Sequence, residues 1–440
     1  MWKLCGCMLA SHHNAGLDDI LTMDAYSLSI ALARNKLTCV DVMRATLNRI
    51  DEINDNCRAI ILLRDRIELL KDAAMADDRR QQRRNSVKDS DAVYSPFEDE
   101  QWLCGIPIAI KDISNVKGIP TTFGGSPLFE GFLPPANDIY VDNLINKGGA
   151  ICIGKTNTPE IGLGSHTFNK IWGTTPNPFD SSRSAGGSSG GAAVAVSTGM
   201  FPCLDGTDMM GSLRNPAGWN NIYSHRPTAG MIPGALKSKM NPLPYPISTA
   251  GPMARSPIDL VLLLGTMVGD KKKFNVSEFL GEQSHRSDKG MRIGWLGDWG
   301  GHLPFEDGIL SLCFDALNVM RDNGLVKLVD DLSSKPVFPA DQLWTSWNTI
   351  RFGMVADNFL KSFDEEKLLG EDSRIKEEMK WEILQGKDVT SADVEKARLV
   401  SNEWHVCLES LFEKYDVLAL PSAQVWPYVR FLAAVMLCQF

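Results

Sequence analysis

Two short apolar runs with a helical pattern between them constrain the fold of this chain more than any other feature. The runs cover residues 106–110 and 150–153, and residues 141–145 between them have the apolar spacing of a helix. Two strands joined through a helix are usually parallel, because a parallel pair needs a long crossover connection. The pattern therefore predicts an α/β fold, which we expect to have a central mixed β-sheet sandwiched by helices on both faces.

Apolar periodicity predicts further elements on either side of this unit. Residues 24–53 are expected to be helical, with Thr38 capping the helix over 40–53. Residues 76–100 are charge-rich, and their alternating acids favour a solvated surface loop over a nucleic-acid-binding arm. The C-terminal half is expected to contain helices over 258–268, 310–321 and 392–412, strands over 292–296 and 326–329, and a buried strand over 417–420.

No internal repeat divides the chain, so we expect one domain over residues 21–440, preceded by an N-terminal extension over 1–20. Residues 429–440 form an apolar tail that is too short to span a membrane. We expect this tail to be either a final core element or the end of a truncated domain.

The balance of charges argues against nucleic acid as the main partner. The chain has 45 Lys and Arg against 54 Asp and Glu, a formal net charge of −9, and an acidic surface repels phosphate backbones. No apolar run reaches the ~20 residues that a membrane helix needs. The 10 cysteines include no CxxC pair, and none is spaced with a histidine for zinc. This usage favours free thiols in a reducing compartment and predicts a cytoplasmic protein.

Three segments carry residues that could perform chemistry, and each also has an ordinary structural explanation. In the first, Lys111 ends the apolar strand over 106–110, where it is either functional or simply paired with Asp112. The second, Gly-Gly-Ser-Ser-Gly-Gly over 186–191, is either a functional turn or a loop whose serine caps the following helix. It lacks the Gly-Lys-Ser/Thr ending of a P-loop, which argues against a phosphate site.

The third segment, over 206–217, places Ser212 in a sharp turn between a glycine and an Arg-x-Pro sequence. Such a turn could present a serine hydroxyl and several backbone N–H groups together. The key positions of the three segments, Lys111, Ser188 and Ser212, are 77 and 24 residues apart. In this order they form a much stronger signal than any segment does alone.

Together the three segments resemble the amidase signature family, and more narrowly its Met-Met variant, which is similar to bacterial-type amidases. The resemblance extends over about residues 21–427 and includes the motifs at 154–160, 173–178 and 251–255. It implies an amidase signature fold and a Ser–cis-Ser–Lys triad with no metal and no cofactor. Ser212 would be the nucleophile, Ser188 the bridging serine after a cis peptide bond, and Lys111 the acid/base. The resemblance also implies an oxyanion hole made by the backbone N–H groups of Met209, Met210, Gly211 and Ser212.

Elementary chemistry agrees with these roles. A serine hydroxyl is a weak nucleophile until a base lies within hydrogen-bond reach. Lysine is charged in water, but burial can lower its pKa by ~3–5 units, so that a neutral amine becomes available. A buried Lys111 could accept a proton through Ser188 and return it to the leaving amine. The predicted activity is hydrolysis of a small-molecule carboxylic amide to an acid and ammonia or an amine, through an acyl-Ser212 intermediate.

Two other functions stay open at this level. One is a catalytically dead amidase-like scaffold, suggested by the short C-terminal end and by Met210 and Ser224, where the family more often has glycine. The other is a glutamyl-tRNA amidotransferase A-type subunit, which would need partner subunits. The oligomeric state is also open, a homodimer included. Specificity is expected to come from loops over 123–135 and 160–172 and from the region over 300–390. Candidate pocket walls, for which core packing is the alternative, are Trp344, Trp347, Phe352 and Met354.

Overall fold

The strand–helix–strand unit forms as the sequence predicts. The computed structural model describes residues 15–86, 94–234, 240–243, 246–270 and 290–429. Strand β2 (Pro107–Lys111) pairs in parallel with β3 (Ile151–Thr156), which places Lys111 opposite Thr156. Helix α5 (Ile139–Asp142) and a π-helical turn (Asn143–Lys147) join them. Every residue of β2 and β3 is buried, which explains why both read as unbroken apolar runs.

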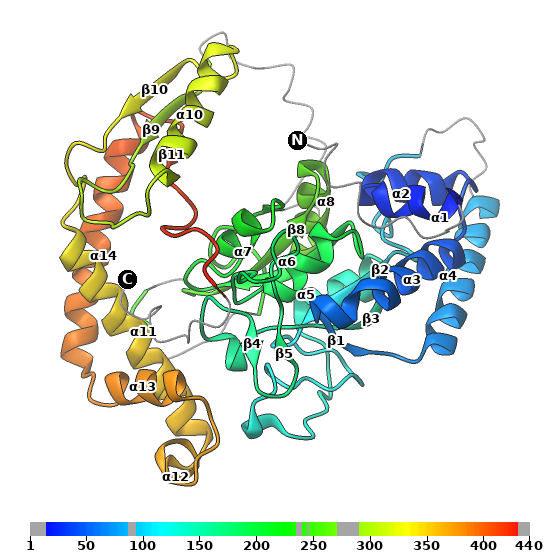
Figure 1. Cartoon of the computed structure of the whole chain (residues 1–440), viewed down its shortest axis with the longest axis horizontal. Coiled ribbons are helices and arrows are strands. Elements are labelled where there is room, and N and C mark those ends of the chain that lie inside the picture. The colour runs from blue at the N-terminus through cyan, green and yellow to red at the C-terminus, as the bar shows by residue number, and fades with distance from the viewer. Residues whose placement is uncertain (1–14, 87–93, 235–239, 244–245, 271–289, 430–440) are drawn as a thin grey trace.

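Two small sheets form the body of the molecule, in the centre and on the right of Figure 1. In the first, β3 lies between β2 and the antiparallel β1 (Ile60–Leu63). In the second, β8 (Thr249–Ala254) lies between β6 (Cys203–Asp208) and β7 (Tyr223–Ser224), all antiparallel. Strands β2 and β6 lie side by side, and there the Lys111 N–H donates to the Asp205 carboxylate at 3.1 Å. The strands of the described residues are therefore divided among small sheets rather than joined in one continuous ladder.

Helices pack around these strands and enclose the main core. Helix α6 contacts β2, β3, β6 and β8, while α3 contacts β2, α4 contacts β3, and α8 contacts β6, β7 and β8. The predicted cap is confirmed, because Thr38 and Asp41 form a reciprocal capping box at the start of α3. The helices of the body are α1 (Ala15–Thr22), α2 (Ala25–Ala33), α3 (Cys39–Cys57), α4 (Arg66–Ser86), α6 (Gly190–Ser197), α7 (Arg214–Trp219) and α8 (Pro257–Val268).

The prediction of a loop over 76–100 is wrong for its first part, because α4 continues to Ser86. Leu69, Ala73 and Ala76 are fully buried at helical spacing, and Arg80 extends the same stripe with only 5% exposure. The Arg80 guanidinium donates to the carbonyl of Cys104 at 2.8 Å. Apart from Arg80, the charged residues thus lie mostly on the solvent side of an amphipathic helix. Residues 87–93 lie outside the described residues.

Short elements complete the loops of the body. Residues Phe168–Asn169 (β4) and Gly173–Thr174 (β5) form a small antiparallel pair. Two 3-10 turns cover Pro127–Phe129 and Glu160–Gly162.

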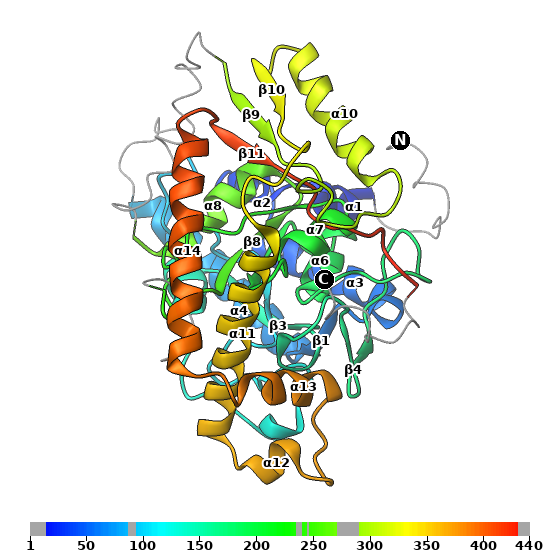
Figure 2. The same cartoon turned by 90° about the vertical axis from the view of Figure 1, so that its left-hand side faces the viewer.

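Residues 292–419 form an outer part on the left of Figure 1, coloured yellow to red. Its sheet is parallel, with β9 (Arg292–Trp295) between β10 (Leu328–Asp331) and β11 (Val417–Ala419). Figure 2 shows α11 and α14 running side by side on this face. The helices of the outer part are α10 (Ile309–Asp322), α11 (Ala340–Ser362), α12 (Glu365–Leu369), α13 (Glu377–Gly386) and α14 (Ser391–Phe412).

Strand β11 forms as predicted, but its predicted burial is wrong. Val417 is 38% exposed and Leu420 47% exposed, because β11 is an edge strand of a three-stranded sheet. The chain then returns to the body, where the Ser184 N–H donates to the Tyr428 carbonyl at 2.8 Å. The apolar tail beyond Val429 and the first 14 residues lie outside the described residues.

None of the helices in the described ranges is long and apolar enough to cross a membrane. The cysteines in these ranges carry free thiols, as predicted: Cys39, Cys57, Cys104, Cys152, Cys203, Cys313 and Cys407.

Candidate active site

Lys111, at the end of β2, is fully buried and surrounded by hydroxyl groups. Its amine nitrogen lies 2.8 Å from the Ser188 oxygen, 2.8 Å from the Ser189 oxygen and 2.9 Å from the Thr207 oxygen. Burial lowers the pKa of Lys111 from 10.5 to about 7, although the charges of nearby Asp205 and Asp208 act in the opposite direction. None of these three hydroxyl partners is charged. The neutral form of the amine is therefore populated near neutral pH.

Asp112 is not the partner of Lys111, so the ordinary structural explanation of this lysine does not hold. The Asp112 carboxylate instead accepts from the backbone N–H groups of Thr122 and Gly124 at 3.0 Å each. It thereby fixes the turn that follows β2.

Ser188 lies where β2, α6 and the loop before α6 meet, and only 2% of it is exposed. The peptide bond between Gly187 and Ser188 is cis, as the family resemblance implied. A Cβ placed on Gly162 would lie 3.6 Å from the Ser188 hydroxyl, so the loop over 160–164 also borders this serine. Ser189 occupies the N-cap position of α6 but makes no capping hydrogen bond, because its hydroxyl faces Lys111 instead.

Ser212 lies beside this pair, on the turn between β6 and α7. The Ser189 N–H donates to the Ser212 carbonyl at 3.3 Å, which ties the two serine-bearing segments together. The Ser212 hydroxyl is half-buried and has no hydrogen-bond partner among the described residues. The structure thus brings Lys111 and Ser188 into direct contact and places the Ser212 backbone next to them, without a hydrogen bond between the two serine hydroxyls.

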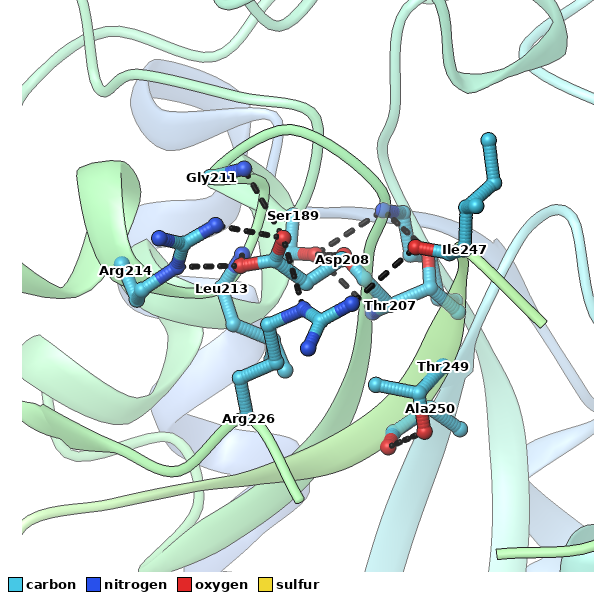
Figure 3. A network of polar contacts seen from close by, with 11 residues as sticks. Ser189, Thr207, Asp208, Gly211, Leu213, Arg214, Arg226, Ile247, Thr249 and Ala250 are labelled. Carbon is cyan, nitrogen blue, oxygen red and sulfur yellow. Dashed lines mark hydrogen bonds and ion pairs between the residues drawn. The ribbon is translucent and has the colours of Figure 1, made fainter. Parts of the chain in front are cut away.

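Asp208 organises the turn that carries Ser212 (Figure 3). It is fully buried and accepts from the N–H groups of Gly211 at 2.8 Å and Leu213 at 3.1 Å. The Arg214 guanidinium donates to both of its oxygens at 3.0 Å, and Arg226 lies 3.6 Å away. Burial alone would raise the pKa of Asp208, but the Arg214 guanidinium and the two N–H groups hold it below its ordinary value.

Backbone N–H groups of the same turn are divided between two uses. The Gly211 N–H is directed to Asp208, and φ at Gly211 is +96°, a conformation that favours glycine. The N–H groups of Met209, Met210 and Ser212 have no hydrogen-bond partner in the part of the chain that the structure describes. Three of the four predicted oxyanion donors are therefore available for a ligand in this structure.

The candidate pocket walls of the outer part separate into two kinds. Trp347 contacts Met210 through its ring N–H, and Met354 is buried in a cluster against which Met209 packs. Trp344 is 39% exposed, and Phe352 packs edge-on against Trp381. The first two thus border the Ser212 turn, whereas the packing of Phe352 against Trp381 belongs to the outer part itself.

Sequence reasoning missed several residues of the site. Ser189, Thr207 and Asp208 are inside the motifs that carry the resemblance, but the spacing of those motifs did not show which side chains meet Lys111 or hold the turn. Arg351 on α11 also reaches Met210, and no sequence pattern signals that contact.

Comparisons with known proteins show the family of the chain. A family model described as Amidase matches residues 41–429. The chain belongs to the amidase signature family. An acylamidase of Rhodococcus erythropolis is 30% identical over 407 residues, which cover 91% of this chain and 79% of that protein. The A-type subunit of the glutamyl-tRNA(Gln) amidotransferase of Chloroflexus aurantiacus is 35% identical over 312 residues, covering 68% of this chain and 58% of that protein.

The solved structure of a bacterial aryl acylamidase superposes on this chain with a TM-score of 0.77. The superposition covers 92% of this chain and 81% of the acylamidase chain, at 24% sequence identity. This likeness confirms the predicted α/β amidase signature fold, and family membership makes the chain a hydrolase of that family.

Proposed function

We propose that this protein hydrolyses a carboxylic amide through an ester formed on Ser212, with Ser188 and Lys111 as its proton relay. The observation that carries the proposal is the fully buried Lys111 amine, 2.8 Å from the Ser188 hydroxyl and with a pKa near 7. A base that is half neutral near pH 7 is well matched to proton transfer at that pH.

The proposed acylation moves one proton out and back. Neutral Lys111 takes the hydroxyl proton of Ser188, and Ser188 takes the proton of Ser212 while the Ser212 oxygen bonds to the substrate carbonyl carbon. The C–N bond then breaks as the proton returns through Ser188 to the leaving nitrogen. Water repeats the sequence on the ester and releases the acid. The Ser212 hydroxyl turns toward Ser188 for this relay, a contact of the kind that tightens when substrate binds.

The negative charge that develops on the carbonyl oxygen needs fixed donors. We assign this role to the N–H groups of Met209, Met210 and Ser212, which are available for a ligand, while the Gly211 N–H stays with Asp208. One such donor contributes about 2.7–4 kcal/mol to the transition state.

The names of two similar proteins and the positions of Met209 and Met210 support a class of substrate. The Rhodococcus relative and the solved structure are, by name, an acylamidase and an aryl acylamidase, and Met209 and Met210 are half-buried beside Ser212. Apolar walls with a few placed polar groups are typical of small-molecule sites. We therefore propose an N-acyl amine with an apolar group next to the scissile amide.

Covalent labelling tests this function. Wild-type protein should react with a fluorophosphonate probe at Ser212 and hydrolyse an N-acyl anilide, whereas Ser212→Ala should do neither. Ser311→Ala, which removes an exposed hydroxyl on α10, is the matched control and should behave as wild type. Labelling that persists in Ser212→Ala would reject Ser212 as the nucleophile, and a folded wild type that cleaves no amide or ester would favour the dead scaffold.

The relative from Chloroflexus motivates a second candidate, an amidotransferase A-type subunit. Hydrolysis of free glutamine that rises when partner subunits are added would support it. Turnover of a simple acylamide by the purified chain alone would support the amidase.

A further inference from the structure

Met210, two residues before Ser212, is contacted by two donors from α11 in the outer part. The ring N–H of Trp347 lies 3.2 Å from the Met210 sulfur, and the Arg351 guanidinium lies 3.0 Å from the same atom. Thioether sulfur is a weak acceptor, so one such contact would restrain the Met210 side chain only weakly. Two donors that converge on one sulfur fix the direction of an otherwise flexible side chain.

Arg351 is itself held in a buried ion pair. It is 8% exposed, and its guanidinium donates to Glu382 of α13, which is 1% exposed. Burial raises the pKa of Glu382, and the charge of Arg351 opposes that effect. Within the described ranges, the Arg351 Nε and one oxygen of Glu382 have no hydrogen-bond partner. Burying two charges with incomplete hydrogen bonding stabilises a fold poorly, so stability alone does not account for this pair.

The Ser212 turn is therefore restrained from two sides. On the side of the body, Asp208 accepts from the Gly211 N–H and binds Arg214. On the side of the outer part, Trp347 and Arg351 hold Met210. Met209 packs against a cluster in which Ile350, Met354 and Ala397 of the outer part meet Ile247 of the body. The three available N–H groups lie between these two anchors.

We propose that Trp347 and the Arg351–Glu382 pair are positioning residues that hold the Met210 side chain and so fix the backbone of residues 209–212. In catalytic terms the inference rests on the proposed function, because these N–H groups are its oxyanion donors. The structural claim does not depend on it: without the α11 contacts, residues 209–212 become mobile.

The variants separate loss of the anchor from loss of the fold. Trp347→Phe keeps the aromatic ring and removes the N–H donor. Arg351→Met combined with Glu382→Gln removes the contact to Met210 without leaving a buried unpaired charge. Arg398→Met combined with Glu395→Gln removes an exposed ion pair of α14 and is the matched control.

Kinetics give the first readout. Both anchor variants should lose about tenfold in kcat, with KM changed by less than about threefold, because a misplaced donor weakens the transition state more than binding. In a Met210→Leu background the same changes should alter kcat by less than about twofold, since the acceptor is already gone. An equal loss in both backgrounds, or wild-type kcat in a folded anchor variant, would overturn the proposal.

Hydrogen exchange gives a readout that does not need turnover. The Gly211 and Leu213 amides, which donate to Asp208 in this turn, should exchange about tenfold faster in the anchor variants than in wild type and the α14 control, while amides of β2 stay unchanged. Unchanged exchange of the Gly211 and Leu213 amides would overturn the inference even if wild-type protein is fully active. Faster exchange in a protein that does not label at Ser212 would support the anchor and reject only the proposed function.

Discussion

The amine nitrogen of Lys111 lies 2.8 Å from the Ser188 hydroxyl oxygen, although the residues are 77 positions apart and sit on a strand and on the loop before a helix. Burial of the amine favours its neutral form, and the hydroxyls around it can donate to a neutral nitrogen as well as accept from a charged one. The pair can therefore exchange a proton without a buried charge at rest.

Activity should follow the neutral fraction of Lys111. Below its pKa of about 7 the amine is protonated and cannot act as a base, so kcat/KM should fall about tenfold per pH unit toward acid. Above about pH 7 the profile should level off. A pH series on an N-acyl anilide measures this, with Lys111→Met as the inactive comparison. A limb that is still rising at pH 9 would show that burial has not lowered the lysine pKa.

The free energy of unfolding should also reflect the lowered pKa of Lys111, and it should rise with pH. The pKa of Lys111 is 10.5 in the unfolded chain and about 7 in the folded one, so between these values the unfolded chain binds more protons. The free energy of unfolding of wild type, relative to Lys111→Met, should then rise with pH across this window, by at most about 1.4 kcal/mol per pH unit. Urea unfolding at several pH values measures it. A difference that stays constant from pH 7 to 10 would contradict a folded pKa near 7.

Asp205 should tune the acidic limb of the activity profile. Its carboxylate accepts from the backbone N–H of Lys111 at 3.1 Å and from the Tyr140 hydroxyl at 2.8 Å. The charge of this carboxylate raises the pKa of the Lys111 side-chain amine. Asp205→Asn should therefore move the acidic limb of kcat/KM to lower pH. Tyr140→Phe keeps the carboxylate charge and is the control. A limb that moves to higher pH in Asp205→Asn would be opposite in sign to this argument.

Gly191 should tolerate no side chain. A Cβ at this position of α6 would lie 2.4 Å from the Asn157 nitrogen and 2.8 Å from the Ala59 carbonyl oxygen, and backbone atoms cannot rotate away. Gly191→Ala should lower the free energy of unfolding by about 3 kcal/mol through overpacking. Gly131→Ala is the control, where open space leaves only the cost of a positive φ, about 1 kcal/mol. Equal values from urea unfolding would contradict the packing argument.

The sequence predicted best the elements whose residues follow a clear local pattern. The apolar runs indicated β2 and β3 with their parallel pairing, Thr38 marked the start of α3, and the segments around Lys111 and Ser188 proved to be in contact. The strands and the cap depend on short-range rules of burial and capping, whereas the contact between Lys111 and Ser188 was expected from the resemblance to the family.

Features that depend on tertiary contacts escaped prediction. Charged residues of α4 looked like a loop because their helix buries only a narrow stripe, and β11 looked buried because its composition does not show that it is an edge strand. The partner of Lys111 was ambiguous between Asp112 and hydroxyl groups until the turn after β2 was known. Arg351 lies 141 residues from Met210, and no local pattern carries information over that separation.

The segment that returns to the body after β11 attaches the outer part to the loops of the candidate site. Residues near its end are bound beside the loop of Ser188, through Ser184 to Tyr428 and through the Trp219 ring N–H to the Val425 carbonyl at 3.1 Å. Together with the α11 contact at Met210, this pins the outer part to the loops of the candidate site at two separate points. The outer part cannot swing away from the body as a hinged lid without breaking both attachments, so we expect substrate to bind without a large rotation of the outer part.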